Sequence, residues 1–320
     1  MTTTHRLYSA LPLVLVAAAA CSRGEAASSS RSESRTDSGA RRVITVLGAR
    51  DPESVKYDPD QDVFFVSMMN GFGSAKDNNG YIVRIPAAAP DQASMFAESG
   101  KSGVTLNAPK GMAIHGDTLW VADIDVLRGF DRHSGAPVRT VDFTAQHPAL
   151  LNDVALGPDG KIYVTDTGIQ MTEFGVLYVG GDGIYSVGPG GAVTVVEQGG
   201  RLGRPNGITW DARAKRWLVV TFDPFQSSMY TFKPGDTTLT ILAHGTGKWD
   251  GVEALPDGRI LVSSWSDSSV HEFGAGGWHQ QVIRAVPEPA DIGYDSKRNR
   301  VAIPITVMGR VEVWELGPGR

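Results

Sequence analysis

The chain has 320 residues, of which 41% are hydrophobic, together with 38 glycines and 18 prolines. This is enough apolar material for one large core or two small ones. The formal net charge of -5 comes from interspersed acids and bases without a long basic run, which argues against a nucleic-acid groove. We therefore expect a small-molecule substrate or a protein partner, and no nucleic acid. The protein is also expected to be a monomer.

Residues 1–21 have the composition of a targeting segment. The apolar run from Leu7 to Ala20 follows a basic residue and is shorter than the roughly 20 residues that span a bilayer, as in a signal peptide. Cys21, the sole cysteine of the sequence, comes directly after a run of alanines. This arrangement resembles the cleavage box of bacterial lipoproteins, in which the exported thiol takes a diacylglycerol. It predicts an exported protein that is lipid-anchored in the bacterial cell envelope.

Ordinary secretion, into the periplasm or the medium, is the alternative, with cleavage near Ala20 or Ala27. Ala18 stands where the lipoprotein box usually has Leu. Because there is no second cysteine, no intrachain disulfide can form and the fold depends on its core. Residues 22–41 are rich in Ser, Arg and Gly and poor in apolar residues, which predicts a flexible tether. Residues 42–320 form the predicted globular domain.

One strand-pair pattern recurs six times between Pro52 and Thr306. Each copy starts with a turn residue, a polar residue, a small residue and an apolar one, with one mismatch allowed per copy. A short apolar strand, a tight turn containing Asp and a second apolar strand follow, and most copies add third and fourth strands. The starts are PESV, PKGM, LNDV, PNGI, WDGV and PADI, at residues 52, 109, 151, 205, 249 and 289.

The spacing of these copies, 40 to 57 residues, is typical of four-stranded propeller blades, with loop insertions in the first and third copies. The sixth copy ends at Trp314 with too little chain for a fourth strand, while the strand from Arg42 to Leu47 is unassigned. We therefore predict an all-β, six-bladed β-propeller in which an N-terminal strand completes the last blade and removes the exposed edge. A parallel β-helix is the alternative, but its repeats are much shorter.

The first strand of each propeller blade lines the central channel, so the second residues of the six starts form a ring at one end. These residues are Glu53, Lys110, Asn152, Asn206, Asp250 and Ala290. Four carry side-chain oxygens, the hard ligands that calcium prefers, whereas the His and Cys that zinc and copper favour are absent. The ring predicts a divalent metal site, with Ca2+ as the ion. Alternatively, Asn and Asp stand there as turn formers.

The second strand of each blade returns to the same face, so the residues after it form a rim around the ring. We expect a substrate pocket lined by Lys110 and by the rim residues Met69, Asn70, Asp123, Asp166, Thr167, Phe222 and Trp265. The insertion at residues 168–182 is apolar at Met171, Phe174, Leu177 and Tyr178. It is either a lid or a segment that packs onto the top of its blade.

The segments PESVKYD, LNDVALGPDG, RPNGITWD and WDGVEALPDG resemble the senescence marker protein, gluconolactonase and luciferin-regenerating enzyme family, which is related to the paraoxonases and diisopropyl fluorophosphatases. The resemblance runs from about Arg42 to the C-terminus. Members are six-bladed propellers that hold a catalytic divalent ion, usually calcium, with a Glu, two Asn and an Asp. The matching residues are Glu53, Asn152, Asn206 and Asp250.

The resemblance implies hydrolysis of a lactone, ester or phosphoester, with the ion as Lewis acid and Asp250 as general base or nucleophile. Two residues depart from the family. Leu150 stands where gluconolactonase-like members have an Arg that holds sugar hydroxyls, which argues against a sugar lactone. Lys110 brings a cation into the ring, either to orient an anionic substrate or to pair with Glu53.

The competing interpretation is a non-catalytic propeller, similar to the NHL-type interaction propellers, that binds a protein, peptide or polysaccharide at the cell envelope. The segment GMAIHGDTLWVAD favours it. An interaction module has no need of four converging oxygens, so calcium binding distinguishes the two interpretations.

Overall fold

The computed structural model describes residues 39–236, 238–274 and 276–319. The predicted signal segment with Cys21 and almost all of the predicted tether fall in residues 1–38, outside the described residues. The described part of the chain forms 26 strands and four 3-10 helices: η1 (Pro90–Gln92), η2 (Thr144–Gln146), η3 (Gly200–Leu202) and η4 (Thr306–Met308). Within these ranges no helix combines the length and the hydropathy of a membrane span.

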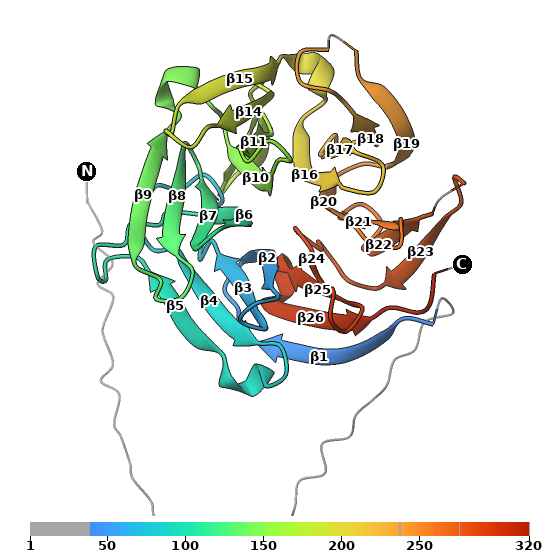
Figure 1. The fold of residues 1–320 in the computed structure, drawn as a ribbon, viewed down its shortest axis with the longest axis horizontal. Helices are drawn as coiled ribbons and strands as arrows, with labels where there is room; N and C mark the ends of the chain where they lie inside the picture. The colour runs from blue at the N-terminus through green and yellow to red at the C-terminus, as the bar shows by residue number, and fades with distance from the viewer. Residues whose placement is uncertain (1–38, 237, 275, 320) are drawn as a thin grey trace, which may run out of the picture. The chain divides into compact units, whose positions relative to one another are not determined.

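The predicted six-bladed propeller is confirmed, because six four-stranded antiparallel sheets surround a central axis (Figure 1). The first strand of each blade is innermost and the fourth outermost. Blade 1 contains β2 (Pro52–Asp58), β3 (Val63–Met68), β4 (Tyr81–Pro86) and β5 (Ser94–Glu98). Blade 2 contains β6 (Pro109–His115), β7 (Thr118–Asp123), β8 (Val126–Asp131) and β9 (Pro137–Asp142). Blade 3 contains β10 (Leu151–Leu156), β11 (Ile162–Asp166), β14 (Gly183–Val187) and β15 (Val193–Gln198).

The remaining blades follow the same order. Blade 4 contains β16 (Pro205–Asp211), β17 (Arg216–Thr221), β18 (Gln226–Thr231) and β19 (Thr240–Thr246). Blade 5 contains β20 (Trp249–Ala254), β21 (Ile260–Ser264), β22 (Ser269–Phe273) and β23 (His279–Arg284). Blade 6 contains β24 (Gly293–Asp295), β25 (Arg300–Ile305), β26 (Arg310–Glu315) and, as its outer strand, β1 (Arg41–Leu47).

The predicted closure by the N-terminal strand is also confirmed. Strand β1 pairs antiparallel with β26 from Arg41 to Leu47, so the first and last described strands share one sheet. On the channel side, the Asp291 amide donates to the Glu53 carbonyl at 2.8 Å and the Val55 amide donates to the Asp291 carbonyl at 3.2 Å. Blades 1 and 6 are therefore joined at the inner edge as well as through β1.

Apolar side chains fill the space between neighbouring blades. Because side chains alternate along a strand, each strand sends every second residue to one face, and the facing sets of two blades form one core. Tyr163 of blade 3 and Trp217 of blade 4 show this packing, with their ring centroids 4.3 Å apart. Trp217 in turn stacks on Phe232.

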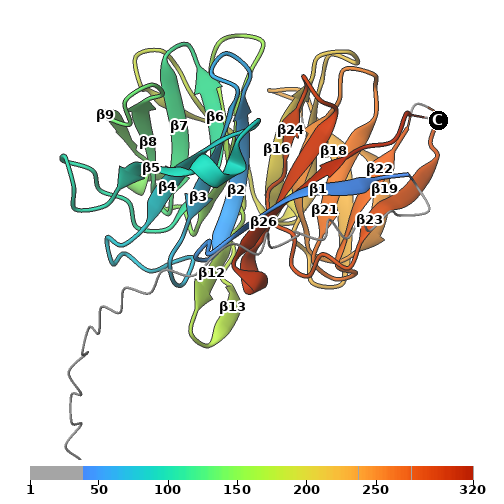
Figure 2. The same cartoon turned by 90° about the horizontal axis from the view of Figure 1, so that it is seen from below.

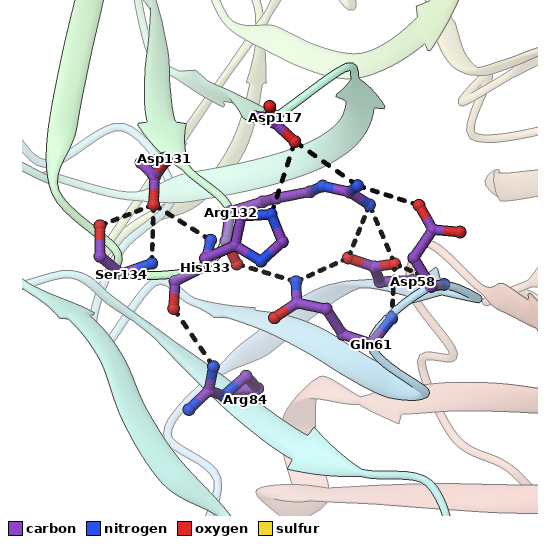
Figure 3. A network of polar contacts seen from close by, with 9 residues as sticks. Asp58, Gln61, Arg84, Asp117, Asp131, Arg132, His133 and Ser134 are labelled. Atoms are coloured by element: carbon purple, nitrogen blue, oxygen red, sulfur yellow. Dashed lines mark hydrogen bonds and ion pairs between the residues drawn. The ribbon is translucent and has the colours of Figure 1, made fainter.

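At the end of the channel away from the ring, ion pairs hold adjacent blades. Arg132 of blade 2 donates from Nη1 to both carboxylate oxygens of Asp58 in blade 1, at 3.2 Å each, and Gln61 bridges the same two residues (Figure 3). Arg298 of blade 6 bonds Asp62 of blade 1 through both terminal nitrogens. These turns are polar and serve to fix the blades in place.

The two predicted insertions lie on the opposite face, which carries the ring and is called the ring face below. The first is the β3–β4 loop, residues 69–80. The second forms a separate hairpin of β12 (Ile169–Thr172) and β13 (Gly175–Tyr178), which projects beyond the blades (Figure 2). The Met171 amide donates to Ser74 Oγ at 2.9 Å, and the Ser74 amide donates to the Met171 carbonyl at 3.1 Å. The insertions therefore meet above the ring face.

Candidate functional site

The ring residues of blades 1 to 5 lie at irregularities in the first strand of each blade. The pairing between first and second strands shifts register at Pro52/Ser54, Pro109/Met112, Leu151/Val154, Pro205/Ile208 and Trp249/Val252. A β-bulge of this kind takes residues out of the ladder and redirects their side chains. The repeated start of each copy, with its polar second residue, is therefore the sequence of a bulge.

Small third residues let the inner strands approach each other closely. A Cβ atom added at Gly207 would lie 2.4 Å from the Asp250 carbonyl oxygen, and one at Gly111 would lie 2.5 Å from the Cα of Asp153. No side chain fits at such distances. Glycine there brings the ring residues of neighbouring blades together at the channel end.

Hydroxyl groups in the second strands satisfy the backbone of the bulges. Thr165 Oγ1 accepts from the Asp153 amide at 3.0 Å and donates to the Asn206 carbonyl at 2.7 Å. Ser263 Oγ likewise accepts from the Gly251 amide and donates to the Ala290 carbonyl, both at 2.8 Å. Each hydroxyl fixes the bulge of its own blade and the ring residue of the next. The sequence interpretation missed these residues, although a Ser or Thr in the apolar second strand was the available signal.

All six ring residues are buried, and three of their oxygens have no hydrogen-bond partner. These are Glu53 Oε2, Asn206 Oδ1 and Asp250 Oδ1. The fourth oxygen-bearing residue, Asn152, donates from Nδ2 to Thr167 Oγ1 at 2.9 Å, which fixes its amide group. Buried oxygens without partners are rare and costly, so this set fits a bound cation. Two carboxylates with amide oxygens are the hard donor set that suits calcium.

The fit to a cation depends on the amide oxygens. Among the described residues, no group of three or more His, Cys, Asp and Glu side chains is arranged to hold a metal ion. The ring contributes two carboxylates, from Glu53 and Asp250, and its other oxygen donors are asparagines. Such a set matches a hard ion rather than zinc or copper.

The two ring carboxyls are in an environment that resists negative charge. Burial raises the pKa of Glu53 well above its usual value, and the nearby Asp250 raises it further. Burial also raises the pKa of Asp250, with a further contribution from Asp291. The Lys110 ammonium acts in the opposite direction on both. Without a cation, these carboxyls favour the protonated form.

Lys110 is among the most buried residues of the ring, with 1% of its surface exposed. Its Nζ donates to the Gly73 carbonyl at 2.7 Å and to the Ala108 carbonyl at 2.9 Å. Burial lowers the pKa of Lys110, and Glu53 counteracts this electrostatically. The hydrogen bonds of the ammonium thus go to backbone carbonyls, one of them in the β3–β4 loop, and not to Glu53. Lys110 ties that loop down over the ring.

The rim residues divide into structural and site-facing sets. Asp123 accepts from the Ala108 amide at 2.9 Å and pairs with Arg128 at 2.6 Å, and Asp166 accepts from the Leu150 amide at 2.9 Å. These carboxylates hold the chain that enters each inner strand. Asn70 bonds the Asn79 carbonyl within its own loop. Thr167 alone among the polar rim residues bonds a ring side chain.

Two apolar rim residues, Phe222 and Trp265, form one wall beside the ring, whereas the third, Met69, packs with Ala108 and Ile124. Phe222 contacts Trp265 edge to face with ring centroids 5.2 Å apart, and both cluster with Leu150 and with Ile169, Met171 and Val176 of the hairpin. The hairpin therefore packs onto the rim through one face. Trp265 Nε1 is buried without a hydrogen-bond partner, yet the indole lies near enough to lower the pKa of Asp250 against the larger effect of burial. The indole N–H therefore lies beside the Asp250 carboxyl.

A six-bladed propeller whose channel end is lined by carboxylate and amide oxygens defines the class of this protein. The family model described as the SMP-30/gluconolactonase/LRE-like region matches residues 52–292. The chain belongs to this family. No match was found among curated protein sequences.

Solved structures share the fold at low sequence identity. A gluconolactonase from Xanthomonas campestris is 15% identical with a TM-score of 0.64, covering 87% of this chain and 90% of its own. A luciferin-regenerating enzyme is 12% identical with a TM-score of 0.59, covering 86% and 95%. A virginiamycin B lyase from Staphylococcus aureus is 10% identical with a TM-score of 0.59, covering 87% and 99%. The same propeller thus carries different reactions, so the site must decide the chemistry.

Proposed function

We propose that the protein is a calcium-dependent hydrolase of a lactone, ester or phosphoester. The observation that carries the proposal is the set of unpartnered buried oxygens on Glu53, Asn206 and Asp250, contributed by three different blades. A module that binds proteins through its outer loops has no need of this arrangement. Membership of a family that includes gluconolactonases supports hydrolysis of an acyl or related bond.

Each ring residue has a role in this proposal. Glu53, Asn152, Asn206 and Asp250 would hold the ion, which when bound polarises a carbonyl or phosphoryl oxygen of the substrate. Thr167 holds the Nδ2 end of Asn152, which leaves the carbonyl end of that amide for the site. Asp250 would take a proton from water or attack the substrate directly.

The wall beside the ring favours an apolar substrate. Leu150 is fully buried and cannot hydrogen-bond a sugar hydroxyl, and the neighbouring side chains in its cluster, Phe222 and Trp265, are aromatic. On the side of Leu150 a sugar hydroxyl would find no hydrogen-bond partner, which disfavours a sugar lactone. In this proposal the Trp265 N–H, which lies beside Asp250, donates to an oxygen of the substrate. Lactones with alkyl substituents, aryl esters and phosphotriesters are the substrates to test.

A calorimetric titration with calcium, combined with this panel of substrates, tests the proposal. Wild-type protein should bind calcium and lose its hydrolytic activity when a chelator is added. Asp250→Asn should lower hydrolysis by at least about 100-fold, whereas Asp91→Asn, at an exposed position in η1, should leave it unchanged. Full hydrolysis by Asp250→Asn with calcium still bound would remove Asp250 from proton transfer. Absence of binding at millimolar calcium would favour the interaction module.

A further inference from the structure

The ring face carries most of the exposed apolar side chains of the described chain. The described ranges contain fourteen exposed large hydrophobic residues. Nine of the fourteen lie in loops or at strand ends on the ring face. The other five are single residues on the outer strands β5, β9, β15 and β19 and at the end of β10. Scattered single residues are ordinary, but a one-sided concentration marks an interaction surface.

Six of these residues, called the apolar tips, occupy connections that begin or end at this face. They are Phe72, Phe174, Leu177, Phe225, Val307 and Met308. They come from four blades: the β3–β4 loop, the β12–β13 hairpin, the β17–β18 turn and η4. Phe174 and Phe225 are the most exposed, at 85% and 89% of their surface. Leu47, Tyr178 and Val179 lie at the same end of the molecule and are exposed as well.

The outward apolar side chains of the hairpin do not take part in the packing of the hairpin onto the rim. Met171 pairs with Val176 and Gln170 pairs with Leu177 across the two strands. The first pair faces the rim cluster with Phe222 and Trp265, so the second pair faces away from it. Leu177 and the turn residue Phe174 therefore extend from a side of the hairpin that contacts no apolar residue of the rim cluster.

We propose that the ring face docks onto a lipid bilayer, with the apolar tips inserted at the boundary between headgroups and acyl chains. Phenylalanine and aliphatic side chains on separate projecting loops suit shallow insertion of about 5–10 Å. They lie on four separate connections, whereas an interface between two copies of a chain is a closely packed surface. The length of chain before β1 agrees with this occupant. If Cys21 carries a lipid, the roughly 20 residues from Cys21 to β1 can span at most about 70 Å, so the lipid would keep the propeller close to the same bilayer.

The charges near the apolar tips set the expected lipid preference. Lys76 of the β3–β4 loop pairs with Asp125, and Arg204 pairs with Asp223 while its guanidinium lies 4.4 Å from the Tyr178 ring centroid. Since these basic side chains are neutralised by neighbours, they offer little attraction to anionic headgroups. Docking is therefore driven by apolar burial, and it should occur on vesicles of phosphatidylcholine and change little with salt.

The experiment places an environment-sensitive NBD label on single cysteines in the full chain with Cys21→Ser, which removes the predicted lipidation site. Labels at Phe174→Cys and Phe225→Cys should brighten and shift to shorter wavelength when phosphatidylcholine vesicles are added. The matched control is Val138→Cys, exposed on the outer strand β9, whose label should not change. Each label reports only the polarity of its own surroundings. If the protein bound vesicles through its N-terminal segment alone, the fluorescence of all three labels would stay unchanged.

A second comparison measures affinity by vesicle co-sedimentation. Phe174→Ser combined with Phe225→Ser should weaken vesicle binding by about tenfold or more, and Val138→Ser combined with Ile241→Ser, on two outer strands, should not. The proposal is overturned if the labels at 174 and 225 stay unchanged on vesicles, or if binding disappears in 0.5 M salt. It is equally overturned if those labels shift without vesicles in step with self-association of the protein, which would make the face a contact between copies.

Discussion

Thr167 is the rim residue that orients a proposed metal ligand of the ring, Asn152. Its hydroxyl accepts from Asn152 Nδ2 at 2.9 Å and donates to the Pro205 carbonyl at 2.9 Å, so it orients one proposed ligand against the strand that carries another, Asn206. Residues that orient metal ligands in this way typically contribute 10-fold to 100-fold in affinity. Thr167→Val keeps the shape of the side chain and removes both bonds.

We predict that Thr167→Val weakens calcium binding by at least about tenfold and lowers the free energy of unfolding of the metal-free protein by about 1 kcal/mol. Calorimetric titration and urea denaturation measure the two effects. Thr167→Ser retains the hydroxyl and is the matched control. Equal calcium affinity in wild type and Thr167→Val would show that Asn152 is not held as a ligand.

The raised pKa values of Glu53 and Asp250 predict how the stability of the metal-free protein depends on pH. Both carboxyls are harder to ionise in the folded state, mainly through burial, so the unfolded state loses its protons at lower pH. Their favourable contribution is complete below about pH 4 and is lost as the pH rises toward the folded pKa. With chelator present, stability should therefore fall with increasing pH.

Urea denaturation at pH 5, 6, 7 and 8 measures this, with the double variant Glu53→Gln and Asp250→Asn as reference. The difference in unfolding free energy between variant and wild type should grow by about 1.4 kcal/mol for each unit by which a pKa is raised. Asp153, whose pKa burial raises to about 7, is present in both proteins. Parallel pH profiles would mean that the two carboxyls ionise normally.

The sequence predicts the positions of some site residues but not the roles of others, for a physical reason. Glu53, Asn152, Asn206 and Asp250 could be placed because each occupies one position of a repeat, and the structure shows all four of them buried. The roles of Asp123, Asp166 and Thr165 could not be predicted. From sequence alone, a polar residue in a strand is equally consistent with a solvated, a catalytic or a backbone-bonded side chain. Only the contacts decide that Asp123 holds the chain before β6. Calcium binding itself stays a prediction.

Among the elements, the two insertions of the ring face act as one cover. The β3–β4 loop is tied to the ring by Lys110 and to the hairpin by two hydrogen bonds between Ser74 and Met171. Their conformations could not be predicted from sequence, since a loop without periodicity takes its shape from contacts with residues far along the chain. Lys110, for which the sequence suggests either an anionic substrate or Glu53 as partner, donates to the Gly73 carbonyl of this loop, and its contact with a substrate stays a prediction.

We predict that Ser74→Ala loosens the hairpin, because the Met171 amide loses its acceptor. Hydrogen exchange at Met171 should become about fivefold faster or more, as expected for the loss of a hydrogen bond of about 1 kcal/mol. Mass spectrometry of peptides covering residues 169–178 measures this. Ser94→Ala, at an exposed position in β5, is the matched control and should leave exchange unchanged. Unaltered exchange in Ser74→Ala would show that the rim cluster alone holds the hairpin.

For the molecule as a whole, the order of the blades was predictable and the interfaces between them were not. The unassigned strand before the first copy and the missing strand of the last copy determine the closure. The sequence does not reveal the ion pairs of Arg132 and Arg298 at the far end of the channel, because both partners look like ordinary surface charges until the ring brings their blades together. The closure of the ring by β1 is thus predicted from sequence and found in the structure, whereas the ion pairs between blades are found only in the structure.

Closure makes β1 essential to the stability of the ring. Ile44 packs with Val311 and Val313 of β26 and with the outer part of blade 1, whereas Leu47 is exposed and pairs with Arg310. Ile44→Asp places a charge among these apolar side chains and should lower the free energy of unfolding by about 3 kcal/mol. Leu47→Asp, which also replaces an aliphatic side chain of this strand by a carboxylate, should shift it by less than about 0.5 kcal/mol. Thermal unfolding followed by circular dichroism measures both, and a released β1 would expose the edge of β26 and cause aggregation. If the two variants unfold at the same temperature, the ring is closed mainly by the backbone bonds of Asp291 with Glu53 and Val55, and β1 is an accessory strand.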